Sequence, residues 1–395
     1  MKKNSRIAPA IVAGLLVLGV VLLMDFALKQ VGQAWQSARA PLPATPKADS
    51  RVAHRHFSKE YHHGFVPLKS GRETYGPFSA DYFINSLGMR DQSPRQVSPE
   101  KPKAGRILLL GDSFIDGVGV NFPETVAGRL SKKLSPQGVE VLNGGVASYC
   151  PTLMEARLRL WILRDRLSFD QALVFIDLSD LRDEWRYRQE PSGTFLETDS
   201  HEFEDAVRED ERQTRPFRLW MESKVEKNFV LLGALLRNLR LLYEAWGSPG
   251  STMPFDPGSW PSYQGPLEPW IRKSLVRQAA AMDGILALCR QEKASLTIVV
   301  YPGRPQVEAE KEEDRHTVFW KNWAASRGVS LVSLYPDFLQ IRNQLDTYLL
   351  GSQDSHWNAR GSQFVAEAVW EKMNRPSGRV PENPKASKSQ AGKQL

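Results

Sequence analysis

The sequence predicts an α/β fold with a mostly parallel sheet. From about residue 104 onward, short runs rich in β-branched and large apolar residues alternate with longer stretches of helical periodicity. Strands separated by crossover helices are typical of a parallel sheet that helices cover on both faces. The predicted strands are 106–110, 139–142, 172–176, 296–301 and 329–334, and the predicted helices are 124–134, 152–166, 266–292, 310–327 and one that follows residue 358.

Composition fits a globular protein with a large core, because 41% of the 395 residues are hydrophobic and 25% are charged. The net charge is +7, but the basic residues are spread widely and match no zinc-finger, RNP or helix-turn-helix pattern, so nucleic acid is not an expected partner. The two cysteines lack metal-ligand spacing. Cys150 and Cys289 could pair in an oxidising compartment, but we expect them to be unpaired, half-buried apolar side chains.

A membrane anchor is expected at the N-terminus. Residues 7–28 are nearly free of charge and follow a basic stretch, and a spanning helix needs roughly 20 apolar residues. A cleaved signal peptide would have a shorter apolar region followed by small residues, so an uncleaved, single-pass anchor is favoured. The positive-inside rule places Lys2, Lys3 and Arg6 in the cytoplasm. Everything after residue 30 is then expected on the periplasmic side of the inner membrane.

The chain divides by composition into four parts. After the cytoplasmic tip and anchor (1–30), residues 31–60 are expected to form a spacer, and 61–374 a globular domain. An acidic and Pro/Gly/Ser-rich insertion at 181–265 interrupts the domain, with a predicted helix at 215–246 that packs on its body. The basic tail, 375–395, is expected to be disordered.

Ser113 is the first candidate for chemistry. It follows Asp112 on the turn that ends the strand 106–110. In an open parallel sheet, reactive groups gather at the carboxyl ends of strands, so Ser113 is placed to be a nucleophile. An Asp-Ser pair that only forms a turn and caps a helix is the alternative.

Gly145 is the second candidate. The strand 139–142 ends in Asn143, Gly144 and Gly145, and a glycine lets a main-chain N–H approach a substrate oxygen closely. Such donors stabilise an oxyanion. An ordinary strand-to-loop turn is the alternative.

Asp354 and His356 form the third candidate, directly before the last predicted helix. One residue separates them, so the carboxylate can orient the imidazole and fix the tautomer in which Nε2 accepts a serine proton. Asp-x-His is also common as polar loop sequence or as metal ligands, but a metal would need further ligands that the sequence does not indicate. No metal or cofactor is expected.

The order of these three candidates resembles the SGNH/GDSL hydrolase family. The matching residues are Gly111–Phe114 (GDSF), Asn143–Gly145 (NGG) and Asp354–Gly361 (DSHWNARG). Asn85–Asp91 (NSLGMRD) is similar to the lead-in of membrane-associated bacterial members, and Tyr301-Pro302 to a late strand of the family.

The resemblance covers roughly residues 80–180 and 294–374. It implies a flavodoxin-like three-layer sandwich, a Ser-His-Asp triad, and hydrolysis or transfer of acyl groups, often acetyl groups on carbohydrate. Ser179 stands where the family offers an oxyanion-binding Asn, and a hydroxyl is a shorter donor. The Asp-x-His spacing is similar to that of alginate O-acetyltransferase-like proteins, and this similarity favours acyl transfer over hydrolysis.

Three aromatic or imidazole side chains near the motifs have two interpretations each. His62 and His63 could approach the site, although a surface pair in a loop is favoured. Trp357, beside the proposed base, could stack on a sugar ring or belong to the core or pocket wall.

The resulting hypothesis is an extracytoplasmic serine esterase or O-acyltransferase. In it Ser113 attacks the acyl carbon, His356 accepts its proton, Asp354 orients His356, and the N–H groups of Ser113 and Gly145, with Ser179, stabilise the oxyanion. The expected substrate is an acylated carbohydrate or another small ester. The alternative is a non-catalytic binding or assembly module of an envelope polysaccharide machine, because of the replaced Asn and the large insertion.

Overall fold

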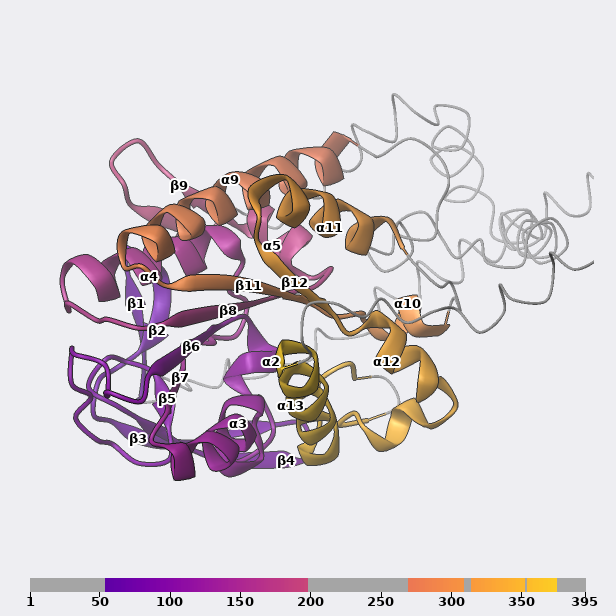
Figure 1. The fold of residues 1–395 in the computed structure, drawn as a ribbon, viewed down its shortest axis with the longest axis horizontal. Helices are drawn as coiled ribbons and strands as arrows, with labels where there is room; N and C mark the ends of the chain where they lie inside the picture. The colour runs from indigo at the N-terminus through magenta and orange to yellow at the C-terminus, as the bar shows by residue number, and fades with distance from the viewer. Residues whose placement is uncertain (1–53, 198–268, 309–313, 352–353, 375–395) are drawn as a thin grey trace, which may run out of the picture.

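The computed structural model describes residues 54–197, 269–308, 314–351 and 354–374. An eight-stranded sheet forms its centre, with strand order β12-β11-β8-β6-β7-β5-β4-β3 (Figure 1). Its strands are β3 (Ser70–Tyr75), β4 (Phe78–Ile84), β5 (Arg90–Asp91), β6 (Arg106–Leu110), β7 (Glu140–Asn143), β8 (Gln171–Ile176), β11 (Ser295–Val300) and β12 (Ser330–Ser333).

The five parallel strands have the flavodoxin-like order. In chain order β6, β7, β8, β11 and β12 are strands one to five, and they lie in the sheet as 2-1-3-4-5. The predicted mostly parallel α/β fold is therefore confirmed, and each of its five predicted strands lies within one residue or so of an observed one.

Helices cover both faces of the sheet, as Figure 1 shows. In β6, Leu108 and Leu110 pack with one core and Leu109 with the other, so the strand is apolar on both faces. The first core takes side chains from α4 (Pro151–Leu163), α9 (Pro269–Gln291) and α11 (Arg315–Arg327). The second takes them from α3 (Val126–Leu134), α12 (Tyr335–Gln340) and α13 (Ala359–Asn374).

An antiparallel extension at one edge of the sheet was not predicted. β5 pairs with β7, β4 with β5, and β3 with β4, all antiparallel. A separate hairpin of β1 (Arg55–Ser58) and β2 (His62–Phe65) precedes it. Ordered structure therefore begins before residue 61, and the prediction of a spacer up to residue 60 is wrong for β1.

The remaining short elements follow the parallel strands. They are α2 (Ser113–Asp116), α5 (Asp180–Arg186), α10 (Arg304–Glu308) and the two-stranded β9 (Tyr187–Gln189) and β10 (Phe195–Glu197), with 3-10 turns at Phe122–Glu124, Ser135–Gln137 and Arg342–Thr347. Cys150 and Cys289 are unpaired, as expected, and fully buried rather than half-buried.

Several expectations lie outside the described residues. These are the anchor at 7–28, most of the spacer, the insertion from 198 onward with its helix at 215–246, and the tail at 375–395. Within the part of the chain that the structure describes, no helix has the length and apolar character needed to cross a bilayer.

Candidate active site

Ser113 is the first residue of the short helix α2, directly after the tight turn that ends β6. Asp112 caps this helix, because its Oδ1 accepts the Phe114 N–H at 3.0 Å. Gly111 must lack a side chain, since a Cβ there would lie 2.5 Å from Cγ1 of Ile115. The turn leaves Ser113 half-buried at the carboxyl end of the central strand, where the sequence places a nucleophile.

His356 and Asp354 lie on the loop that precedes α13. The loop is fixed by an antiparallel bridge between Leu349 and Trp357, and by the Leu350 N–H, which donates to the His356 carbonyl at 2.9 Å. Oδ1 of Asp354 accepts a hydrogen bond from the backbone N–H of His356 at 2.8 Å. The same oxygen lies 2.7 Å from Nδ1 of the His356 ring.

The structure brings the three predicted residues together across 243 positions of sequence. Nε2 of His356 lies 2.8 Å from Oγ of Ser113, while Nδ1 faces Asp354. Burial raises the pKa of Asp354, but the hydrogen bonds from His356 outweigh it, so the pKa lies below its ordinary value and the carboxylate stays ionised. This arrangement favours the His356 tautomer with the proton on Nδ1 and a free lone pair toward the serine hydroxyl.

Gly145 does not occupy the predicted oxyanion position. Its N–H donates to Oδ1 of Asn143 at 3.0 Å, and it is buried under the Ser113 turn, where a Cβ would lie 2.5 Å from the Asp116 nitrogen. Gly145 thus allows close packing of two backbones, and the prediction that its N–H serves the oxyanion is wrong in this structure.

Ser148 offers the N–H that Gly145 does not. It lines the same cavity as Ser113 and His356, its φ is +63°, and its N–H has no acceptor among the described residues. The other N–H groups of this loop are all engaged: Gly145 with Asn143 Oδ1, Val146 with Gly111 O, Ala147 with Asp116 Oδ2, and Tyr149 with Val146 O. The sequence did not indicate Ser148 as a donor, because serine rarely adopts a positive φ and its residue type does not predict one here.

Ser113 has a similar free donor. The N–H groups of residues 114–118 all donate to Asp112 or to the Ser113 carbonyl, whereas that of Ser113 has no acceptor in the described part of the chain. The N–H groups of Ser113 and Ser148 are therefore the two candidates for an oxyanion site.

Ser179 is held by acidic neighbours. Its hydroxyl lies 2.7 Å from Oδ1 of Asp177 and 3.3 Å from Oδ2 of Asp112, and its N–H also donates to Asp177 at 2.8 Å. A hydroxyl has one hydrogen to donate, and here that hydrogen serves a carboxylate. Ser179 is not among the residues that line the cavity, so the predicted oxyanion contact is not observed.

Buried carboxyl groups lie beneath the nucleophile turn. Burial raises the pKa of Asp112, Asp177 and Asp180, and mutual repulsion adds to the rise for Asp112 and Asp180. Tyr301 donates to Asp112 at 3.0 Å. Among the described residues, no three His, Cys, Asp or Glu side chains are arranged to hold a metal ion.

A cavity of about 350 Å³ opens beside Ser113 and His356. We divide its lining into two walls. The strand-end wall comes from the ends of β6 and β7 and from the loop before α13, and consists of Ser113, Val118, Gly119, Ala147, Ser148 and His356. The hairpin wall comes from β1, β3 and β4, and consists of Arg55, Glu73, Thr74, Tyr75 and Tyr82.

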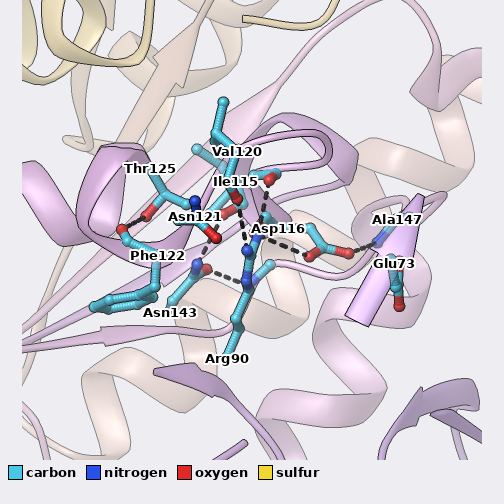
Figure 2. Close-up of polar contacts among 12 residues, drawn as sticks. Glu73, Arg90, Ile115, Asp116, Val120, Asn121, Phe122, Thr125, Asn143 and Ala147 are labelled. Atoms are coloured by element: carbon cyan, nitrogen blue, oxygen red, sulfur yellow. Dashed lines mark hydrogen bonds and ion pairs between the residues drawn. The ribbon is translucent and has the colours of Figure 1, made fainter. Parts of the chain in front are cut away.

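A buried arginine, Arg90, binds the backbone that follows α2 (Figure 2). Arg90, from the NSLGMRD segment, donates to the carbonyls of Asp116 at 2.8 Å and Gly117 at 2.7 Å, and to that of Val120 at 2.6 Å. Its guanidinium lies 3.7 Å from the centre of the Tyr82 ring. Arg90 thus fixes the backbone that follows α2.

Asp116 joins the two walls. Its Oδ2 accepts the Ala147 N–H at 3.1 Å and an N–H of Arg55 at 3.0 Å (Figure 2 shows the first contact). Arg55 also forms a forked pair with Glu73, whose Oε1 contacts His54 at 2.7 Å. Although burial opposes it, this set of donors lowers the pKa of Glu73 to about 2. These charged residues were not predicted.

His62 and His63 are not a surface pair, so that prediction is wrong. His62 is 8% exposed, and Nε2 of His63 contacts the Ala147 carbonyl at 2.8 Å. Burial lowers the pKa of His63 to about 4, so the ring is neutral and supports the cavity loop as a hydrogen-bond donor. Trp357 is 3% exposed and packs on Phe114 and Tyr301, so it belongs to the core rather than to a sugar-stacking surface.

Comparison with known proteins gives structural matches alone. No family model and no curated protein sequence matches the chain. A member of the G-D-S-L lipolytic protein family from Veillonella parvula is similar at 11% identity, with 69% of this chain and 99% of that chain covered and a TM-score of 0.38. The acetylxylan esterase Axe2 from Geobacillus stearothermophilus is similar at 11% identity, with 70% and 97% covered and a TM-score of 0.39.

A further structural match is the acetyl xylan esterase AlAXEase, at 12% identity, with 68% of this chain and 99% of that chain covered and a TM-score of 0.38.

Proposed function

We propose that this protein is an extracytoplasmic serine esterase or O-acyltransferase that acts on a glycan or a related acyl ester, with acetyl as the acyl group. The observation that supports it most is the continuous hydrogen-bonded series at the cavity. It runs from Ser113 Oγ to His356 Nε2 at 2.8 Å and from His356 Nδ1 to Asp354 Oδ1 at 2.7 Å.

In the first half of the reaction Ser113 Oγ attacks the acyl carbon of the ester. His356 Nε2 takes the hydroxyl proton as the new bond forms, and Asp354 stabilises the resulting imidazolium. The N–H groups of Ser113 and Ser148 donate to the oxyanion of the tetrahedral intermediate. When the intermediate collapses, His356 returns the proton to the departing alkoxide, and an acyl-serine remains.

In the second half a hydroxyl compound attacks the acyl-serine, and His356 again removes its proton. Water as the attacking group gives hydrolysis, whereas an alcohol of a second saccharide gives transfer. Ser113 leaves as the alcohol and recovers its proton from His356, so the enzyme returns to its starting state.

The cavity supports a small polar ester as substrate. Its volume of about 350 Å³ is at the lower end of the range for ligand sites, and charged or hydroxyl groups such as Glu73, Thr74 and Ser148 line it. This volume limits the length of the acyl chain that the cavity can enclose. A short acyl group on a hydroxyl-rich alcohol fits better.

The extracytoplasmic location is supported by the sequence alone. The apolar run at 7–28 and its basic flank predict a single-pass anchor with the domain outside the cytoplasm.

A non-catalytic binding module of an envelope polysaccharide machine is the second candidate. It is favoured by the two expected oxyanion donors that are engaged elsewhere, the Gly145 N–H with Asn143 and the Ser179 hydroxyl with Asp177. An active wild-type protein would exclude it.

The test uses the detergent-solubilised full-length chain and its Ser113→Ala variant. Wild type should release p-nitrophenol from p-nitrophenyl acetate and should be labelled by a fluorophosphonate at Ser113, and the variant should do neither. Folded wild-type protein that neither turns over the ester nor is labelled would favour the binding module.

A further inference from the structure

Tyr75 stands at the tip of the β3–β4 hairpin, beside the candidate triad. It is the last residue of β3, pairs with Phe78 across the turn, and is followed by Gly76 with a φ of +55°. The tight turn places the ring over the cavity that Ser113 and His356 also line. Tyr75 is 39% exposed, and its side chain belongs to none of the hydrophobic cores among the described residues.

The Tyr75 ring contacts the imidazole. Its centroid lies 5.1 Å from that of His356 with the planes at 75°, and Phe114 stacks on the same imidazole at 5.0 Å with the planes at 28°. Edge-on and stacked contacts at such distances are favourable. The two rings therefore limit the orientations that the imidazole can take.

The Tyr75 hydroxyl also interacts with the acid of the triad. It lies close enough to the Asp354 carboxylate to help keep the pKa of this acid below its ordinary value. Burial and the negative charge of Asp354 raise the pKa of Tyr75, so the phenol keeps its proton and acts as the donor. The ionised form of Asp354 is thus favoured by hydrogen bonds within its own loop and by the nearby hydroxyl of the distant hairpin.

This double contact is more than the hairpin needs for folding. The cross-strand pairs of β3 and β4 are formed by the backbone, and the Tyr75 side chain supports neither of the sheet's cores. Its contacts in the cavity are instead with the two residues that set the proton position at Ser113.

We propose that Tyr75 is a positioning residue, which acts on Ser113 through Asp354 and His356. The hydroxyl holds the Asp354 carboxylate in its orientation toward Nδ1, and the ring restrains the imidazole. The inference deepens the proposed function, on which it rests for its catalytic consequence. It also ties the unpredicted hairpin to the predicted triad.

The first experiment compares wild type with Tyr75→Phe and Tyr75→Ala in the full-length protein. Each is assayed on p-nitrophenyl acetate from pH 4.5 to 9. Tyr75→Phe should lower kcat by roughly 3- to 10-fold, and Tyr75→Ala by roughly 10- to 100-fold, because the first loses the hydroxyl proposed to hold Asp354 and the second also loses the ring contact.

The pH profile distinguishes positioning from a structural role. In Tyr75→Phe the acidic limb of kcat/KM should move to higher pH by about half to one unit. Asp354 loses a donor that favours its ionised form, and the less satisfied carboxylate then holds the imidazolium proton more tightly. Tyr348→Phe, which removes a hydroxyl bonded to Arg360 outside the cavity, is the matched control and should leave the limb in place.

A second readout needs no turnover. The NMR titration of the His356 ring should have its midpoint at higher pH in Tyr75→Phe than in wild type. This result would support the positioning role even if the protein proved inactive, a finding that would count against the proposed function alone. A Tyr75→Phe titration and pH profile that superimpose on those of wild type would overturn the inference, as would losses that only follow a fall in melting temperature.

Discussion

The strand-end wall and the hairpin wall of the cavity differ in origin and in content. The first is formed by turns after β6 and β7 and by the loop before α13, and it carries the groups proposed to react, Ser113 and His356. The second comes from β3 and β4 at the antiparallel edge of the sheet and from β1 of the separate hairpin, and it carries the Arg55–Glu73 ion pair and Tyr75. Reacting groups and the surface that faces the substrate therefore come from separate stretches of sequence, so one can change without the other.

The largest expected effect tests whether the reaction belongs to the strand-end wall. Ser113→Ala and His356→Ala should each lower kcat by at least about 10⁴-fold, and the double variant should lose little more, since triad members act as a unit. Steady-state kinetics on an acetyl ester, with circular dichroism as the folding control, measures this. Retained activity in Ser113→Ala would show that the reacting groups do not lie in the strand-end wall.

A glutamate of the hairpin wall and one outside the cavity should affect stability in opposite directions as the pH changes. Glu184, on α5, accepts from Thr152, and burial raises its pKa to about 7, whereas the pKa of Glu73 in the hairpin wall is lowered to about 2. A raised folded-state pKa means that stability falls as pH rises from about 4.5 through 7. A lowered one means that stability is present above about 4.5 and is lost as pH falls toward 2.

Glu184→Gln should therefore remove part of the stability loss between pH 5 and 8, on the order of 3 kcal/mol for a shift of this size. Urea unfolding at pH 5, 6.5 and 8 measures it. Glu73→Gln is the contrasting variant, because it should weaken the protein at all three pH values. An unchanged slope in Glu184→Gln would contradict the assignment.

A moderate effect is expected for substrate binding at the hairpin wall. Nε and Nη2 of Arg55 are engaged by Glu73 and Asp116, whereas Nη1 has no acceptor among the described residues and the side chain lines the cavity. Arg55→Lys keeps the charge but loses the fork. It should raise KM about 10-fold for an acetylated sugar and leave kcat within about threefold, as expected for a contact made equally before and during the reaction.

The same variant should behave like wild type with p-nitrophenyl acetate, whose aryl group offers no hydroxyl oxygens. A fall in kcat without a change in KM would move Arg55 from binding to chemistry and would blur the distinction between the walls.

The smallest effect is expected for Ser179→Ala. The hydroxyl already donates to Asp177 at 2.7 Å, so its loss should change kcat by less than about threefold. The assay is the one used for Ser113→Ala. A loss beyond tenfold would show that the hydroxyl turns to the oxyanion during the reaction.

The sequence predicted the parallel sheet and the triad contacts for physical reasons. Strands buried on both faces are largely apolar, as in β6 and β11, and are easily distinguished from amphipathic helices. Ser113 follows β6, and the Asp354–His356 pair lies on the connection between the last parallel strand, β12, and α13, so both are expected near the carboxyl ends of the parallel strands.

The antiparallel edge and the oxyanion donors could not be predicted in the same way. β3 reads SGRETY and alternates between exposed and half-buried positions, so no apolar period marks it. The choice between the N–H groups of Gly145 and Ser148 depends on which acceptors the folded loops provide, and the Asn143 side chain that engages Gly145 has no local signature. Such features depend on tertiary contacts.

The position of Asp116 has a practical consequence for shortened forms of this protein. A chain cut at residue 61, the boundary that composition suggests, would lack Arg55 and with it a cationic partner of a carboxylate that is 0% exposed. The remaining charge would have to be met by Arg90, whose Nη1 lies 3.9 Å from Oδ1, or by protonation. A recombinant soluble domain should therefore begin ahead of His54, so that the turn bearing the nucleophile keeps its electrostatic support.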